Sequence, residues 1–289
     1  MKLNTRTVFP LVLISLALLN ACATSTENNE IEPVAGSAKA TPVPLPDVAP
    51  LINQLALQGG CKDSTAEMRL TFTGENGQRE QLDFRVQRRY APDQVATLLT
   101  VLAPREETSK SLLMYEKPDQ PTEAISYLAG LKSLTRFGSD RILNFRGSRS
   151  AIQELLGLEL KQYAIEKTER VSEGSEALIK VEMKEEKLRR LAFPRLLAFF
   201  KESSQGLEPA RFELQNSRGE TLKIVRVAEY KNIQGYPTIT RVEIEDKEQK
   251  RNLELTTRDI KYDRALAPAI FTEDNLIKTV TEASKKLVQ

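Results

Sequence analysis

Apolar and polar residues alternate with a period of two along most of the chain after residue 62, which is typical of strands that bury one face. Turn sequences such as Gly74–Gly77 and Asn216–Gly219 separate these runs and are short enough to make neighbouring strands antiparallel. Strands are predicted at 68–72, 82–86, 95–102, 111–116, 122–128, 131–137, 163–171, 177–183, 212–214, 222–227, 239–244 and 253–257.

Three segments depart from this period. A first helix is expected after Asp47, with Val48, Leu51, Ile52 and Leu55 on its apolar face and Gly59-Gly60 at its end. A terminal helix capped by Thr272 carries Leu276, Ile277, Val280 and Leu287. Residues 148–158 also look helical. The run Arg195–Phe200 has two interpretations, a core strand, which is favoured, and an amphipathic membrane contact.

A long antiparallel meander must bury its single apolar face. The expected fold is therefore mainly β with minor α: an unclosed antiparallel half-barrel with helices covering the concave apolar face, formed by residues 46–289. Gaps between helices would leave an apolar pocket there. Candidate lining residues are Leu70, Phe72, Phe84, Val86, Leu98, Leu113 and Tyr115. The alternative is that the same residues fill an ordinary packed core.

The amino-terminal segment reads as a secretory signal over residues 1–21. Lys2 and Arg6 precede an apolar stretch from Val8 to Leu19 that is too short for a permanent membrane span. Its end, Leu19-Asn20-Ala21-Cys22, resembles the lipobox of bacterial lipoproteins. The resemblance implies cleavage between Ala21 and Cys22 and a lipid on the Cys22 sulfur. Residues 22–45, the lipidated cysteine and a polar segment without apolar period, are expected to form a disordered tether.

Charge and composition exclude several classes of function. Removing Lys2 and Arg6 from the 42 basic residues leaves 40, which equals the number of acidic residues, so no nucleic-acid partner is indicated. The pair Arg88-Arg89 is expected at the surface. The absence of histidine excludes His-based catalysis, and Cys61, expected to be buried, is the single thiol left after lipidation. No metal, cofactor or enzymatic activity is expected.

The carboxy-terminal half resembles a known family. The segments are Asn216 to Lys223, Asn232 to Pro237, and Pro268 with Phe271-Thr272 and Leu276. More loosely, the resemblance extends back to Phe84 and includes Leu113-Met114-Tyr115 and Phe145 to Ser148. Together they look like the bacterial outer membrane lipoprotein-sorting family, in the superfamily of the LolA and LolB carriers and the sensor RseB. The resemblance implies an unclosed barrel around an apolar cavity. Arg149 and Tyr236 depart from the usual acidic residue and tryptophan of that family.

Two readings of function follow. The first is a lipid-anchored binding module on the periplasmic face of the outer membrane, which holds acyl chains or a lipidated partner and takes part in lipoprotein or lipid sorting. Ala23 favours the outer membrane, because an aspartate after the cysteine favours inner-membrane retention in many Gram-negative bacteria. The second is an RseB-like sensor or an accessory subunit of an envelope transporter.

Overall fold

The computed structural model describes residues 44–288 except 57–59, 74–76, 118, 119, 121, 139–141, 146, 147, 152–159, 187–190 and 205. The folded unit spans Pro44–Gln289. Cys22, Ala21 and the expected tether up to residue 43 lie outside the described residues.

The folded unit is built mainly from strands. Within the described residues, the helices are α1 (Ala49–Ala56) and α3 (Glu273–Val288), with 3-10 turns η2 (Arg105–Lys110), η3 (Leu160–Gln162) and η4 (Pro268–Phe271). The strands are β1 (Asp63–Thr73), β2 (Arg79–Ala91), β3 (Gln94–Ala103), β4 (Leu112–Glu116), β5 (Glu123–Leu128), β6 (Ser133–Gly138), β7 (Ile142–Phe145), β8 (Ser148–Ala151), β9 (Tyr163–Glu173), β10 (Glu176–Glu185), β11 (Arg195–Ser203), β12 (Gly206–Gln215), β13 (Thr221–Ile233), β14 (Tyr236–Asp246) and β15 (Arg251–Tyr262).

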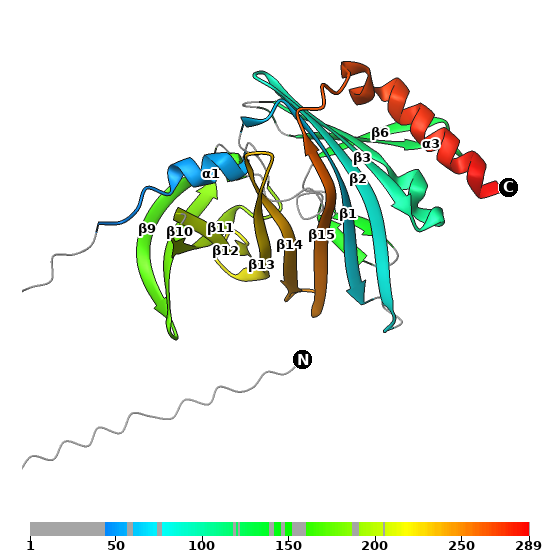
Figure 1. Ribbon diagram of the computed structural model, residues 1–289. Helices are drawn as coiled ribbons and strands as arrows, with labels where there is room; N and C mark the ends of the chain where they lie inside the picture. Colours follow the sequence, from blue (N-terminus) through cyan, green and yellow to red (C-terminus); the bar gives the residue numbers. More distant parts are fainter. Residues whose placement is uncertain are drawn as a thin grey trace, which may run out of the picture. The chain divides into compact units, whose positions relative to one another are not determined.

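Thirteen strands form one antiparallel sheet in the order β6-β5-β4-β3-β2-β1-β15-β14-β13-β12-β11-β10-β9. The first and last strands in chain order, β1 and β15, pair with each other near the middle of the sheet. The edge strands β6 and β9 are not paired with each other, so the sheet is curved but open (Figure 1). The predicted unclosed half-barrel is confirmed. The strands β7 and β8 form a separate hairpin.

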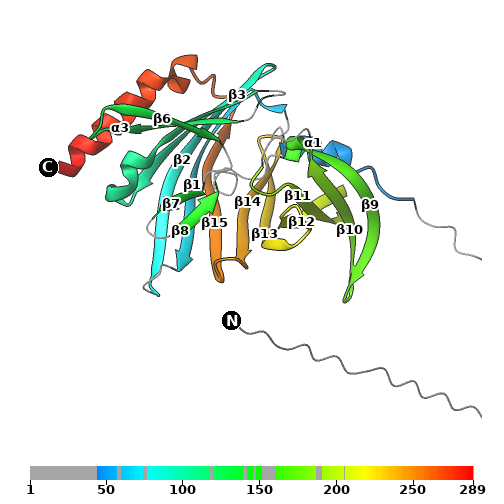
Figure 2. The same ribbon diagram turned by 180° about the vertical axis from the view of Figure 1, so that it is seen from behind.

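Helices α1 and α3 contact opposite faces of the sheet. Val48, Leu51 and Ile52 of α1 belong to the large apolar cluster on the concave face. Leu276 and Val280 of α3 instead pack on a second cluster that lies behind β3–β5, and the view from behind shows α3 outside the curve of the sheet (Figure 2). The expected covering of the concave face therefore holds for α1. The sheet needs a second cover because β3 and β4 are apolar at consecutive positions and have no polar face.

The amino-terminal ends of α1 and α3 follow the sequence pattern, whereas Gly59, expected at the end of the first helix, lies outside the described residues. The Ala49 amide donates to Asp47 Oδ1 at 3.0 Å, and the Asn275 amide donates to Thr272 Oγ1 at 3.3 Å, as N-caps do. Residues 195–203 form strand β11, which confirms the core-strand interpretation of this segment. The helical prediction for 148–158 is wrong over Ser148–Ala151, which is strand β8, and its remainder lies outside the described residues. Pairing with β7 outweighed a weak local helical pattern there.

Candidate functional site

The concave face of the sheet carries one continuous apolar surface. Strands from both halves of the sheet contribute to it, together with α1 and the short segments around Leu160 and Phe193. Phe84 on β2, Val181 on β10 and Phe200 on β11 have no exposed surface. Hydrophobic attraction is not directional, so such a surface can pack on itself or on an apolar guest. The residues that form it are buried, as in a packed core.

Charged side chains close one end of this surface. Lys223 Nζ lies 2.8 Å from Asp246 Oδ2, and the two side chains are 4% and 0% exposed. Arg251 Nε lies 3.7 Å from the same oxygen. The three residues are cross-strand neighbours on β13, β14 and β15. The cations lie 6.0 Å from the rings of Phe193 and Phe72. A buried charge this close to apolar rings is tolerated only because it is paired.

The sequence pattern did not locate this charged group. The alternation within 222–227 predicts that Leu222 and Ile224 are buried, but the buried positions of β13 are Lys223 and Val225. Apolar residues occupy positions of both parities in this strand, so alternation does not select the buried face. The missed signal is that Lys223 opposes Asp246 across the β13–β14 pair, and a cross-strand pair of opposite charge can be buried together.

Polar residues also mark the opposite end of the concave face. A row of directly paired residues crosses four neighbouring strands at this end: Tyr262 on β15, Ser64 on β1, Arg88 on β2 and Thr97 on β3. Arg88 is 9% exposed and Thr97 is fully buried. The expectation that Arg88-Arg89 is a surface pair is thus wrong for Arg88 and correct for Arg89. Consecutive strand residues point to opposite faces, which separates the two arginines.

Cys61 lies at this same end and is buried, as the sequence analysis expected. Burial raises the pKa of the thiol to about 12, and the nearby carboxylates Asp263 and Asp63 add to the effect. Burial likewise raises the pKa of Tyr90 and of Tyr262 to about 12. A thiol with such a pKa carries almost no thiolate near neutral pH, so the burial and the raised pKa of Cys61 both favour a structural role.

We therefore expect Cys61 to resist alkylation. Against the ordinary thiol pKa of 9.0, a value of about 12 lowers the thiolate fraction at pH 8 by ~1000-fold. Iodoacetamide labelling, followed by mass spectrometry on a variant without Cys22, should be slower by at least this factor in the native protein than in urea. Native and unfolded rates within tenfold of each other would contradict the assignment.

The raised pKa of Cys61 also predicts that the free energy of unfolding falls as pH rises above about 9, because only the unfolded thiol ionises there.

The seven candidate lining residues do not share one surface. Leu70, Phe72, Phe84 and Val86 belong to the concave cluster. The remaining three belong to the cluster under α3, namely Leu98, Leu113 and Tyr115. In β3 and β4 apolar residues occupy both odd and even positions, so the sequence did not show which set of side chains faces inward. The concave residues of these strands are Leu99, Val101, Leu112 and Met114.

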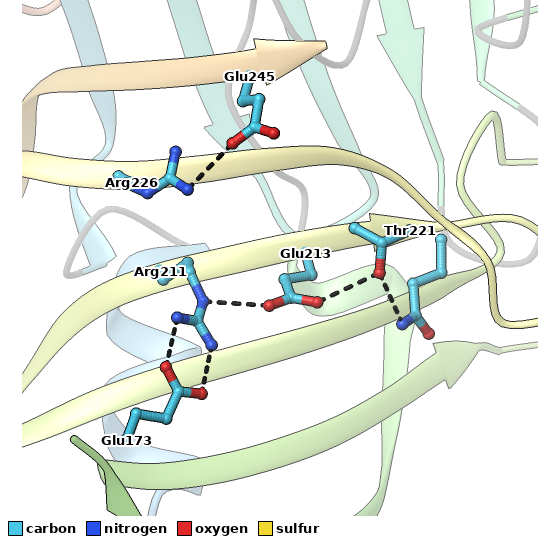
Figure 3. A network of polar contacts seen from close by, with 7 residues as sticks. Glu173, Arg211, Glu213, Thr221, Arg226 and Glu245 are labelled. Carbon is cyan, nitrogen blue, oxygen red and sulfur yellow. Dashed lines mark hydrogen bonds and ion pairs between the residues drawn. The ribbon is translucent and has the colours of Figure 1, made fainter. Parts of the chain in front are cut away.

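A network of paired charges lies on the outer face of the half of the sheet that contains β9, β12 and β13 (Figure 3). Arg211 binds both carboxylate oxygens of Glu173 at 2.7 Å and lies 3.1 Å from Glu213, and its guanidinium covers the ring of Phe199 at 3.9 Å. Thr221 donates to Glu213 at 3.2 Å. The hydrogen bonds from Arg211 lower the pKa of the Glu173 carboxyl. These groups satisfy one another, which is typical of a solvated sheet face and not of a reactive site.

Among the described residues, no group of three or more cysteine and carboxylate side chains is placed to hold a metal ion. Within the same residues, no helix is both long and apolar enough to cross a membrane.

Solved structures share this fold. An outer membrane lipoprotein-sorting protein domain from Vibrio parahaemolyticus superimposes with a TM-score of 0.67 at 18% identity, covering 80% of this chain and 97% of that one. A DUF1329 family protein from Desulfovibrio piger gives 0.66 at 16% identity, with coverage of 79% and 96%. A LolA superfamily protein from Nitrosomonas europaea gives 0.61 at 15% identity, with coverage of 79% and 98%. The chain thus has the LolA-like fold.

Sequence comparison adds the family. A family model described as "-like: Uncharacterized protein" matches residues 93–278, more than half of the chain, so the protein belongs to that family. Comparison with the curated proteins found no match.

Proposed function

We propose that this protein is a lipid-anchored periplasmic module that holds an acyl chain, or the lipid of a lipidated partner, against its concave apolar face. The proposal places it at the periplasmic face of the outer membrane, in the sorting of lipoproteins or lipids. Its chemistry is binding and release without bond breaking.

The continuous concave cluster is the observation that carries this proposal. Each methylene removed from water contributes about 0.8 kcal/mol, so a guest chain must meet apolar groups on all sides. The concave cluster offers such groups over most strands of the sheet, and α1, with Val48, Leu51 and Ile52 facing it, supplies a cover. The fold shared with a lipoprotein-sorting domain is consistent with this use.

The anchor is supported by the sequence alone. The lipobox-like Leu19-Asn20-Ala21-Cys22 supplies a cysteine for lipidation, and the polar segment after it supplies reach. For a flexible segment of about 22 residues, the expected end-to-end distance is roughly 25 Å. The module would thus act within a few nanometres of the membrane.

Lipid binding can be tested on a variant that begins at Ala23, which has neither the signal segment nor acyl chains of its own to occupy the concave face. We expect organic extracts of the purified variant to contain bound lipid by mass spectrometry. Delipidated protein should bind a fluorescent fatty acid saturably, and palmitate should displace it. Absence of both co-purified lipid and saturable probe binding would refute the proposal.

The same experiments bear on the second reading, a sensor or transporter subunit. Crosslinking in intact cells should give short-lived contacts for a carrier. A stable stoichiometric partner, combined with no bound lipid, would replace the carrier proposal with the subunit reading.

A further inference from the structure

A pocket of about 440 Å³ lies on the face of the sheet away from the concave cluster. Its floor is formed by the ends of β2–β6, and η4 with the first residue of α3 forms its roof. This is the face on which Ala96 and Phe271 belong to the second apolar cluster. The pocket is therefore distinct from the candidate acyl-chain surface.

The floor of the pocket is one cross-strand row. Arg89 pairs with Ala96, Ala96 with Tyr115, and Tyr115 with Glu123. Directly paired residues of antiparallel strands point to the same side, so all four side chains face the roof. The single methyl group of Ala96 stands between two long side chains, which leaves a depression at the centre of the row.

Two contacts hold the roof above this depression. The Tyr115 hydroxyl donates to the Phe271 carbonyl oxygen at 2.8 Å. Arg136 on β6 bridges sheet and helix, with Nη1 2.9 Å from Glu123 and Nη2 2.5 Å from Glu273. The pocket is thus built by side chains that tie distant segments together, and its shape does not depend on a ligand.

The charged side chains that line the pocket differ in whether they form ion pairs. Its lining includes Arg89, Lys117, Arg136, Glu123 and Glu273. Both carboxylates are engaged by Arg136. Within the described part of the chain, Arg89 and Lys117 have no ion pair, and both side chains are exposed. Two cations therefore face a hollow whose remaining wall, Ala96 with Pro268 and Phe271, is apolar.

We propose that this pocket is a second binding site, for a phosphate or carboxylate group carried on a small apolar body. Arg89 and Lys117 contact the anion, because guanidinium and ammonium groups form charge-assisted hydrogen bonds to such oxygens. The apolar body lies over Ala96 against Phe271. A volume of about 440 Å³ accepts a small molecule or the headgroup end of a lipid.

Calorimetric titration of the anchor-free full chain tests this site with three probes. Phenyl phosphate and benzoate represent soluble anions, and monomeric dihexanoyl phosphatidic acid represents a lipid headgroup. We expect saturable binding of at least one probe, weaker at high salt, and none of the neutral control benzyl alcohol. Binding of the lipid alone assigns the site to a headgroup, and binding of phenyl phosphate or benzoate assigns it to a soluble anion.

Variants make the test specific. Arg89→Gln/Lys117→Gln should weaken binding by at least about tenfold, since both anion contacts are lost. The control Arg218→Gln/Lys247→Gln removes two exposed cations elsewhere and should leave affinity within about twofold. Ala96→Val should weaken binding by filling the floor, with its thermal unfolding measured alongside. If Ala96→Val fails to fold, the Arg89/Lys117 variant still decides.

Two results would overturn the inference: no saturable binding of any probe at millimolar concentration, or binding that survives Arg89→Gln/Lys117→Gln unchanged. Fatty-acid binding on the concave face should be the same in that variant and in the parent. The two sites can therefore fail or succeed independently.

Discussion

Replacing Asp246 by alanine is expected to destabilise the protein by about 3–5 kcal/mol, because it leaves the buried Lys223 ammonium without its partner. The loss also removes the acceptor for the Gln249 amide, which donates to Asp246 Oδ1 at 2.9 Å in the β14–β15 turn. Domains of this kind are stable by about 5–15 kcal/mol, so the change is a large fraction of the total. Urea unfolding followed by circular dichroism measures it.

A neighbouring pair supplies the matched control. Glu245 lies 3.0 Å from Arg226 on the outer face, where the two side chains are 39% and 50% exposed (Figure 3). Glu245→Ala should cost less than about 1 kcal/mol. The double variant Lys223→Met/Asp246→Leu should be more stable than Asp246→Ala alone, because no unpaired ammonium remains. A cost below 1 kcal/mol for Asp246→Ala would contradict the burial of this pair.

Replacing residues 1–22 by a cleavable secretory signal without a lipobox cysteine is expected to move the protein from the membrane fraction to the soluble periplasmic fraction. Each buried methylene of an acyl chain contributes about 0.8 kcal/mol, and two chains together make release slow. Removing the acylated sulfur removes this attraction entirely. Palmitate labelling and detergent phase partition of cell extracts measure the change.

The other cysteine provides the control for the anchor. Cys61→Ser should remain labelled and membrane-bound, because Cys61 is buried in the folded unit and carries no lipid in this account. A protein secreted without residues 1–22 that still partitions with the membrane would show that another element holds it there.

The sequence was most informative where apolar residues occupy only every second position of a strand. In β1 and β2, Leu70, Phe72, Phe84 and Val86 alternate with polar neighbours, and all four are buried on the concave face. The helix caps at Asp47 and Thr272 were local signals and were confirmed. Local signals of this kind do not depend on distant parts of the chain.

The sequence was least informative where both parities are apolar. Leu98 and Leu113 were placed with the concave set but lie under α3, because β3 and β4 are buried on both faces. Pairing between strands decided the rest. The buried Lys223 and the row from Arg89 to Glu123 exist only once cross-strand register is known. The apolar pattern of a single strand does not show how that strand is aligned with its neighbours.

Methyl NMR of the anchor-free protein with a spin-labelled fatty acid tests the central claim most directly. Met114 and Met183 are buried in the concave cluster, and Ile277 of α3 packs on the opposite cluster. Binding on the concave face should broaden the Met114 and Met183 methyl signals strongly and that of Ile277 much less. Methionine signals that stay sharp at saturating fatty acid would show that the concave face is a closed core and that the protein carries no acyl chain there.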